Sequence, residues 1–338
     1  MTPFKYFVGI DMASATFTAC VGTMPWAIVV KPETFENHED GFASFLGRLK
    51  EQNLPPDHTV VCMEATGVYG EGLAYFLYAS NYIVAVEPPL NIQRKFPVNG
   101  SKNDLQDSQN IAEYACRYTD KLSLWKPRDE ILEQVKLLLT TRQQFSAQLT
   151  AHKNAFHAAN RKKISSELAK KVHTDMIQQI TKHIKAIDIE IRRLIDTNPT
   201  FKRALLLLLS IPGIGLQLAA HLIIMMQYSL DPRVLSAFVG ICPYQHESGS
   251  SIYRNPTSRH YGPPAIRKLL YLAACSVSTH PKEFRQYFAR KKAEGKPGKL
   301  VLNNIQNKLL KIACAVIRTQ KPFIPNYVAV NPLVLNNA

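Results

Sequence analysis

The chain has 338 residues, of which 46% are hydrophobic and 20% are charged. This composition is typical of a globular protein and excludes a mostly disordered or collagen-like chain. Lys and Arg outnumber Asp and Glu by 41 to 26, so the formal net charge is +15. A charge balance this basic indicates an anionic partner, with nucleic acid as the first class to expect and an acidic membrane surface as the second.

The positive charge is concentrated in the second half of the chain. Residues 1–150 hold 13 Lys and Arg against 17 Asp and Glu, a net charge of −4, whereas residues 151–338 hold 28 against 9, a net charge of +19. We therefore expect the first half to supply carboxylates for chemistry and the second half to bind a polyanion. The alternative is that many of these lysines only form a solvated surface.

The first 125 residues show short apolar runs separated by amphipathic segments. The pattern predicts strands at Tyr6–Ile10, Thr16–Val21, Trp26–Val30, His58–Met63 and Tyr82–Val86, and helices at Asp40–Gln52, Gly70–Ser80 and Lys102–Arg117. The first three strands follow one another as in a meander, and the later strands alternate with helices. This order predicts a mixed α/β sheet covered by helices.

Residues 129–196 have a different pattern. Apolar residues recur there at three- and four-residue steps on both sides of Asn160–Ser166, a segment that contains Arg161-Lys162-Lys163. Two long amphipathic helices are predicted, in an antiparallel hairpin or a coiled-coil arm. Such an arm would serve dimerisation or clamp a nucleic acid. The alternative is an ordinary helical domain packed on itself.

After Pro199 the sequence predicts a helix, a tight glycine turn and a second helix at Leu216–Met226. Free backbone N–H groups near Gly213 and Gly215 would bind a nucleic-acid phosphate without reading sequence, as in helix-hairpin-helix modules. The same glycines are equally consistent with a simple turn. A long loop is predicted over residues 241–264, followed by helices and a loosely ordered tail from Lys321. The predicted helices are Ala265–Val277, Lys282–Lys292 and Leu300–Arg318.

The six cysteines are scattered, with no Cys-x-x-Cys pair and no histidine spacing that suggests zinc. We therefore expect reduced thiols and a cytoplasmic protein. No basic start followed by an apolar run indicates a signal peptide. The most apolar stretch, Ala204–Met226, is interrupted by polar residues and glycines and falls short of the roughly 20 apolar residues that a bilayer requires. No membrane partner is expected.

Four acidic residues stand out. Asp11 and Glu64 each end a predicted strand, and Asp104 and Asp107 share one face of a predicted helix. If the two strands are parallel neighbours, both of their acids emerge at one edge of the sheet. Clustered carboxylates repel one another and persist with cations, and hard oxygen ligands select Mg²⁺ or Mn²⁺. Taken singly, Asp104 could be a helix N-cap and Glu64 could cap a turn.

These motifs resemble the signatures of the DEDD transposases, insertion-sequence recombinases related to the Piv pilin-gene invertase. The resemblance spans about residues 5–320. It departs from the family at Asn103, where Thr is more frequent, and at Ser108, where Ala is common; neither departure removes a carboxylate. The matching segments are Phe7–Asp11, Glu64–Gly67, Lys102–Asp107, Ser210–Gly215, Phe238–Pro243 and Glu247–Ser251.

The resemblance implies a domain organisation. Residues 1–125 would form a RuvC-like catalytic domain of the RNase H-like fold, and residues 126–198 a long helical, coiled-coil region. Residues 199–325 would form a mostly α-helical C-terminal transposase domain with the helix-hairpin-helix-like element, and residues 326–338 a tail.

The resemblance also implies the chemistry: the four acids hold Mg²⁺, or Mn²⁺, and Ser248 is the nucleophile that forms a transient protein–DNA phosphoester. From the residues alone, Ser248 is a turn residue in a Gly/Ser loop, and Tyr253 is a rival nucleophile. Arg254 and Arg259 could neutralise the scissile phosphate or make generic backbone contacts.

Three kinds of partner follow from the same resemblance. Similar proteins act on double-stranded DNA, both donor and target, and are guided by a structured non-coding RNA, called a bridge RNA. They work as homo-oligomers, dimers or tetramers, with one subunit's acidic site completed by another subunit's serine.

Other functions stay open at this point. A RuvC-like metal-dependent nuclease would use water as the nucleophile, and Ser248 would then be structural. A nucleic-acid-binding module would keep the acids as remnants or caps. A sugar or acetate kinase also begins with a strand followed by Gly-x-Asp, but a second glycine-rich phosphate loop is missing from the sequence.

Overall fold

The chain forms two compact units, Met1–Arg128 and Asp129–Ala338. A computed structural model describes residues 4–65, 67–96, 104–248, 252–258, 262–280 and 282–325, with the backbone alone for 245–248, 252–256 and 282. Each unit has its own hydrophobic core. The tail expected at residues 326–338 lies outside the described residues, and the four-part division of the chain stays a prediction.

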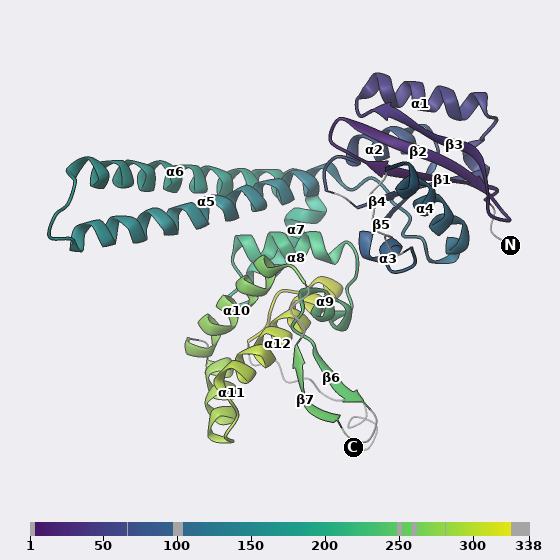
Figure 1. Ribbon diagram of the computed structural model, residues 1–338. Coiled ribbons are helices and arrows are strands. Elements are labelled where there is room, and N and C mark those ends of the chain that lie inside the picture. The colour runs from purple at the N-terminus through teal and green to yellow at the C-terminus, as the bar shows by residue number, and fades with distance from the viewer. Residues whose placement is uncertain are drawn as a thin grey trace, which may run out of the picture. The chain divides into compact units, whose positions relative to one another are not determined.

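The first unit is built on a five-stranded mixed sheet with the strand order β3-β2-β1-β4-β5 (Figure 1). β2 pairs antiparallel with both β1 and β3, whereas β4 pairs parallel with both β1 and β5. The expected meander and α/β class are confirmed, and this strand arrangement is that of the RNase H-like class. The elements are β1 Tyr6–Met12, β2 Thr16–Thr23, β3 Ala27–Glu36, α1 Glu39–Glu51, β4 Thr59–Glu64, α2 Glu71–Ala79, β5 Ile83–Glu87, α3 Pro89–Gln93 and α4 Asp104–Arg117, with short 3₁₀ helices at Pro56–His58 and Thr119–Lys121.

Helices cover both faces of this sheet. Val8 and Ile10 of β1 pack with residues of α1 and α2 on one face, and Phe7 packs with Ile111 and Ala115 of α4 on the other. Successive side chains of a strand point to opposite faces, so β1 and β4, which are buried on both faces, read as continuous apolar runs. Asp11 and Glu64 stand where these runs end.

The edge strand β3 is longer than the sequence predicted. The expectation was Trp26–Val30, but the strand runs to Glu36 through the segment Lys31-Pro32-Glu33-Thr34. Most of these residues are exposed, and an edge strand tolerates proline and charged side chains on its unpaired side. The polar composition of this segment concealed the strand.

The second unit is almost entirely helical. The short helix α9, which the sequence analysis did not predict, begins at Pro232 after the N-cap Asp231 and ends at Gly240 in the left-handed conformation. The elements are α5 Glu130–Arg161, α6 Glu167–Thr197, α7 Pro199–Leu209, α8 Leu216–Met226, α9 Pro232–Val239, β6 Pro243–Ser248, β7 Ile252–Ser258, α10 Pro264–Thr279, α11 Lys282–Ala293 and α12 Gly298–Thr319.

α5 and α6 lie side by side as an antiparallel hairpin (Figure 1). Only the base of the hairpin, at residues such as Leu132 and Ile195, enters the core that α7, α8, α10 and α12 share. Further out, Ile180 of α6 is buried, and pairs of side chains connect the two helices. Arg142 forms a bidentate ion pair with Asp188, at 2.6 and 3.0 Å. The outer pairs are Phe145 stacked on His183 and His152 Nδ1 at 3.0 Å from His173 Nδ1.

The prediction of a long loop over residues 241–264 was wrong. β6 and β7 pair antiparallel within this segment, with Ser248 opposite Ile252 and His246 opposite Arg254. The Pro, Gly and Ser content suggested a loop, but Gly249, Ser250 and Ser251 fall between the two strands in the sequence, and Pro243 is the first residue of β6, a position that needs no ladder N–H. Pro256 of β7 falls between Arg254 and Thr257, where the pairing register shifts. β6 and β7 therefore pair although the composition of this segment is typical of a loop.

Among the helices of the described residues, none combines the length and the apolar character that a membrane crossing requires.

The first prediction concerns His221 of α8. Burial lowers the pKa of His221 to about 4, whereas an unfolded histidine titrates near 6.5. Between these values the unfolded state binds a proton that the folded state does not, so the free energy of unfolding falls as the pH falls from 6.5 towards 4. At pH 5 the loss is on the order of 2 kcal/mol. The variant His221→Gln should lack this part of the pH dependence.

Two optical signals separate the units in this experiment. Trp26 and Trp125, the two tryptophans of the chain, both belong to the first unit. Urea unfolding at pH 5 and pH 7.5 is followed by circular dichroism, which the helical second unit dominates, and by tryptophan fluorescence. The variant should change the pH dependence of the unfolding seen by circular dichroism and leave that seen by tryptophan fluorescence unchanged. An identical pH dependence of both proteins by circular dichroism would contradict the assignment.

Candidate metal centre and nucleic-acid interface

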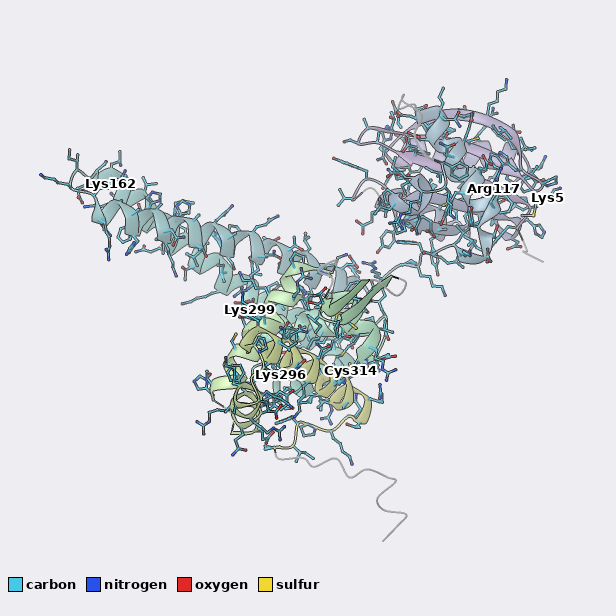
Figure 2. The ribbon with its side chains drawn as sticks, turned by 60° about the horizontal axis from the view of Figure 1, so that its bottom comes forward. Lys5, Arg117, Lys162, Lys296, Lys299 and Cys314 are labelled. Atoms are coloured by element: carbon cyan, nitrogen blue, oxygen red, sulfur yellow. The ribbon has the colours of Figure 1, made fainter. Side chains whose placement is uncertain are left out.

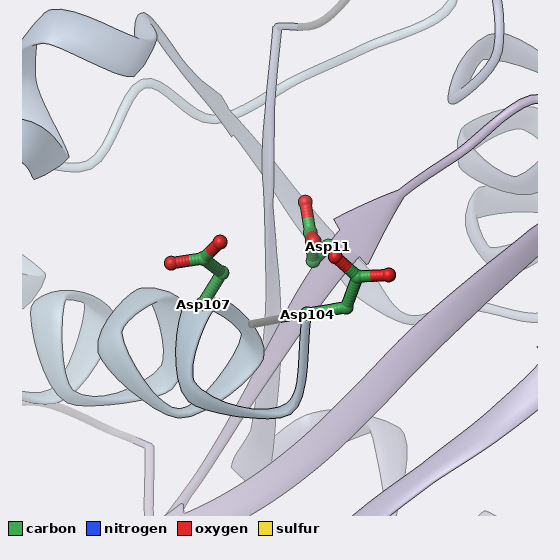
Figure 3. Close-up of side chains that lie close together, drawn as sticks. All are labelled: Asp11, Asp104 and Asp107. Atoms are coloured by element: carbon green, nitrogen blue, oxygen red, sulfur yellow. The ribbon is translucent and has the colours of Figure 1, made fainter. Parts of the chain in front are cut away.

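Three carboxylates converge at the end of β1. Asp11 is the penultimate residue of β1, and Asp104 and Asp107 lie in the first turn of α4. One carboxylate oxygen of each lies within 4.8 Å of those of the other two (Figure 3). Asp11 and Asp107 are half-buried, and Asp104 is exposed. The sequence predicted that Asp11 of the strand acts together with Asp104 and Asp107 of the helix. The three side chains do lie close together in the structure.

The contact between α4 and β1 brings these carboxylates together. Gly9 lies two residues before Asp11, and a Cβ atom built on it would lie 2.1 Å from the Ala112 nitrogen and 2.2 Å from the Ser108 oxygen. No side chain fits there, so the backbone of the helix packs directly on the strand. Ser108 is fully buried at this contact, and its Oγ donates a hydrogen bond to the Leu105 oxygen at 2.9 Å.

This donor set is suited to a hard divalent cation. Three carboxylates at this spacing repel one another, and the helix N-terminus relieves only part of the repulsion. A cation between them removes the rest. The three donors are all oxygens, which is the ligand type of Mg²⁺ and Mn²⁺ and not that of zinc sites rich in His and Cys. The exposed Asp104 leaves this side of the group in contact with solvent.

Glu64 lies beside this group but not in it. β1 and β4 pair parallel with Ile10 opposite Met63, so Asp11 and Glu64 occupy corresponding positions at the same edge of the sheet, as the sequence analysis required. The alternation along the strands puts both on the α4 face, since Cys62 packs there. Glu64 is half-buried. Adjacent strands are about 4.8 Å apart. The side chain of Glu64 is therefore long enough to reach a cation held by the three aspartates.

Glu87 is a carboxylate that the sequence analysis missed. It ends β5 opposite Glu64, and it is 1% exposed. Its oxygens accept hydrogen bonds from the Ser123 backbone N–H at 2.6 Å, from Asn91 Nδ2 at 3.2 Å and from Tyr114 Oη at 3.5 Å. A signal was available, because Glu87 also ends an apolar run, just before Pro88-Pro89.

Glu87 perturbs its neighbours electrostatically. Burial, followed by the charge of Glu87, raises the pKa of Tyr114 to about 12. Burial, with smaller contributions from Glu87 and Glu64, also raises the pKa of the Cys62 thiol. Both groups therefore stay neutral at physiological pH. The three hydrogen bonds that Glu87 accepts from protein groups give it a structural role.

Ser248 belongs to the second unit. It is the last residue of β6, and the neighbouring residues 249–251 lie outside the described residues. The register puts Ser248 and Arg254 at positions of one face of the β6–β7 hairpin and Tyr253 at a position of the other face. Arg259 lies outside the described residues. The serine and the three aspartates are thus parts of different units.

The glycines of the turn between α7 and α8 have separate roles. Gly213 has φ +81°, and a Cβ atom on it would lie 2.7 Å from Val277 Cγ1, so it packs against α10. Gly215 is the N-cap of α8, makes no side-chain cap and has open space around its Cα. Asp188, whose carboxylate is paired with Arg142, lines one pocket together with Gly213 and Gly215. The phosphate-binding role of this turn stays a prediction.

A basic surface lies on α11 and α12. Lys308 Nζ lies 5.6 Å from the ring centre of Phe284 and 5.5 Å from that of Tyr287, and the Arg290 guanidinium is 5.7 Å from the ring centre of Tyr287. These rings hold the cations in place. Figure 2 labels Lys296 and Lys299 in this part of the unit. We call the exposed side chains Arg285, Arg290, Lys292, Lys296, Lys299, Lys308 and Lys311 the α11–α12 basic surface.

Comparison with known proteins gives two family matches and two relatives that align with this chain over nearly their full length. Residues 8–160 match the family model of the DEDD transposases of IS110, and residues 205–289 match the model described as the IS116/IS110/IS902 transposase family. The chain is 28% identical to the pilin gene-inverting protein of Moraxella bovis over 327 residues, which cover 94% of this chain and 98% of that protein. The corresponding protein of Moraxella lacunata is 29% identical with the same coverage.

Two solved structures of Thermus thermophilus RuvC resemble part of the chain. One is a complex with a Holliday junction substrate, with a TM-score of 0.28 and 10% identity, and the other has a TM-score of 0.26 and 11% identity. Each alignment covers 36% of this chain and 99% of the RuvC chain.

The contact at Gly9 generates the second prediction. Gly9→Ala puts a methyl group against the backbone of α4 and should lower the free energy of unfolding of the first unit by about 3 kcal/mol. Gly47→Ala in α1 is the control, because no atom lies within 4 Å of its added Cβ, and it should raise the free energy by about 0.5–1 kcal/mol. Urea unfolding followed by tryptophan fluorescence measures both. Equal stability of the two variants would show that α4 does not pack on Gly9.

Proposed function

Because this chain belongs to the IS116/IS110/IS902 family of transposases, and is thus a DNA recombinase, we propose that it cuts and rejoins DNA with a Mg²⁺-dependent acidic site and a serine nucleophile. The observation that carries the proposal is the convergence of Asp11, Asp104 and Asp107, with Glu64 beside them. Mn²⁺ is the alternative cation. A bound divalent cation supplies positive charge that stabilises a phosphoryl oxygen and the leaving oxygen of a phosphodiester.

The residues of the chain divide the work. Asp11, Asp104, Asp107 and Glu64 hold the cation and orient the scissile phosphate. Ser248 Oγ attacks the phosphorus, its proton passes to solvent, and the P–O bond to one nucleotide breaks, so that the leaving oxygen takes up a proton. The product is a phosphoester between Ser248 and DNA. The reverse attack by a DNA hydroxyl on this ester releases Ser248 and joins the strands without an external energy source.

The division of the acids and the serine between two units is compatible with assembly from more than one copy. The acids and the serine belong to different units of the chain, so a site that is completed between subunits is compatible with the fold. We propose a homo-oligomer, a dimer or tetramer, in which the α5–α6 hairpin contributes to assembly. Arg254, on the same hairpin face as Ser248, and Arg259 would bind the scissile phosphate bidentately.

We further propose that a structured non-coding RNA, a bridge RNA, selects the donor and target DNA. The second half of the chain has a net charge of +19 but no zinc finger or other recognisable base-reading motif. Lysines and arginines that bind phosphates fix position and not sequence. Base pairing with RNA would supply the missing sequence specificity, and the α11–α12 basic surface would hold the backbone of the RNA or the DNA.

The third prediction tests the nucleophile. The protein is incubated with junction DNA of its element, the RNA transcribed from its flank and Mg²⁺, then denatured, and labelled DNA attached to protein is measured. Ser248→Ala should abolish the adduct, and Asp107→Asn should reduce it at least 100-fold, since each removes one half of the chemistry. Ser250→Ala, a serine of the same segment, is the matched control and should leave the adduct in place.

The same assay separates the proposal from hydrolysis by water. Free cleavage products without an adduct, formed by Ser248→Ala but not by Asp107→Asn, would show a RuvC-like nuclease in which Ser248 is structural. Binding of DNA with neither cleavage nor an adduct in the wild-type protein would reduce the molecule to a nucleic-acid-binding module.

The fourth prediction tests the α11–α12 basic surface. The triple variant Lys292→Gln, Lys296→Gln, Lys299→Gln should weaken binding of the RNA and of duplex DNA. Each lost phosphate contact should lower the slope of log K against log salt concentration by about 0.7–0.9. The control neutralises three exposed lysines of the first unit, Lys31, Lys50 and Lys121, so that the net charge is equal. Equal losses in both triple variants, measured by fluorescence anisotropy, would reject this surface as the specific contact.

A further inference from the structure

Asn37 connects the two loops that follow the acidic strand ends. It lies directly after β3, and its side-chain Nδ2 donates hydrogen bonds to the Ala13 oxygen at 3.0 Å and to the Tyr69 oxygen at 3.1 Å, with the Ser14 oxygen at 3.4 Å. Its backbone N–H donates to the Ala15 oxygen at 2.8 Å. Ala13 comes two residues after Asp11, and Tyr69 comes five residues after Glu64.

The loop that carries Tyr69 lies against the ends of both strands. A Cβ atom built on Gly70 would be 3.3 Å from Met63 Sδ and 3.5 Å from Met12 Cγ. Met12 directly follows Asp11, and Met63 directly precedes Glu64. The position of this loop is therefore coupled to the ends of β1 and β4, and the Asn37 amide fixes the loop to the segment that leaves β1.

The chemistry of the amide suits this place. An Asn side chain offers two N–H donors on one nitrogen, and the carbonyl groups of two different loops accept them. A hydrophobic side chain of the same size would leave these carbonyls without this partner. The two loops would then lose this link between them, and the spacing of the strand ends would depend on the backbone ladders alone. A metal site requires its ligands to be held within about 0.5 Å, and residues behind the ligands commonly change affinity by 10–100-fold.

We propose that Asn37 is a positioning residue of the acidic site: it holds the loop after Asp11 to the loop after Glu64 and thereby sets the spacing at which the carboxylates bind one divalent cation. The inference rests on the proposed function, because it assumes that these acids bind a cation. It adds a residue that touches neither the cation nor DNA.

The experiment compares two isosteric substitutions in the full-length protein. Asn37→Leu removes the donors that bridge the two loops. Thr23→Val is the matched control, because it removes the hydrogen bond from Thr23 Oγ1 to the Lys5 oxygen, 3.1 Å, at the opposite end of β1. Mn²⁺ alone is the probe, and its binding is measured by isothermal titration calorimetry, with urea unfolding of each variant alongside.

Asn37→Leu should weaken Mn²⁺ binding about 10-fold, whereas Thr23→Val should bind Mn²⁺ as the wild type does at a comparable loss of stability. In the adduct assay, Asn37→Leu should require a correspondingly higher Mg²⁺ concentration and regain most of its rate when Mg²⁺ is saturating. Asn37→Gln, which keeps the amide on a longer side chain, should fall between Asn37→Leu and the wild type. It also provides the comparison if Asn37→Leu does not fold.

The outcomes distinguish this inference from the proposed function. Wild-type Mn²⁺ affinity in Asn37→Leu, or in Asn37→Gln if only that variant folds, with binding lost in Asp107→Asn, overturns the role of Asn37 and leaves the metal site intact. Equal weakening in Asn37→Leu and Thr23→Val overturns it too, because general loss of stability would then be the cause. Absence of Mn²⁺ binding in the wild type, or binding that Asp107→Asn does not change, overturns the proposed metal site itself.

Discussion

The packing of α4 on β1 at Gly9 is the contact on which the acidic site depends. Gly9 and Asp11 lie on the same face of β1, and Asp104 and Asp107 lie in the first turn of the helix that crosses this face. Any side chain at Gly9 would move the backbone of α4 away from the sheet, and both aspartates with it. Ser108, Ala112 and Ala115 are fully buried in this region, and their small size serves the same close approach.

The mutually parallel strands β1, β4 and β5 each carry an acid at their last residue or one residue before it, and these acids have different surroundings. Asp11 lies among other carboxylates, which favours a cation. Glu87 is enclosed and accepts hydrogen bonds from Ser123, Asn91 and Tyr114, so its charge is compensated by the protein itself. Glu64 lies between them in the sheet, paired with Glu87 on one side and next to the strand of Asp11 on the other. Carboxylates at corresponding strand ends thus have surroundings that favour a cation in one case and a structural role in another.

The second unit separates its core from its charged surfaces. The shared apolar core ends near the base of the α5–α6 hairpin, and the outer part is joined by the buried Ile180 and by pairs such as Arg142–Asp188. The α11–α12 basic surface in turn packs its cations on Phe284 and Tyr287. Ordered cations lose less conformational entropy when they bind phosphates.

The strands of the first unit, the long helices, the charge asymmetry and four candidate acids, three of which meet, were predictable from the sequence, because periodicity and residue type are local properties. It misjudged β3 beyond Val30 and the β6–β7 hairpin, where edge position and cross-strand pairing outweigh a polar or loop-like composition. The position of Glu64 beside the aspartates, the burial of Glu87 and the hydrogen bonds from Asn37 to Ala13 and Tyr69 became visible in the folded structure alone. Each of these depends on segments distant in the chain that meet only after the sheet has formed, and no local pattern encodes such a meeting.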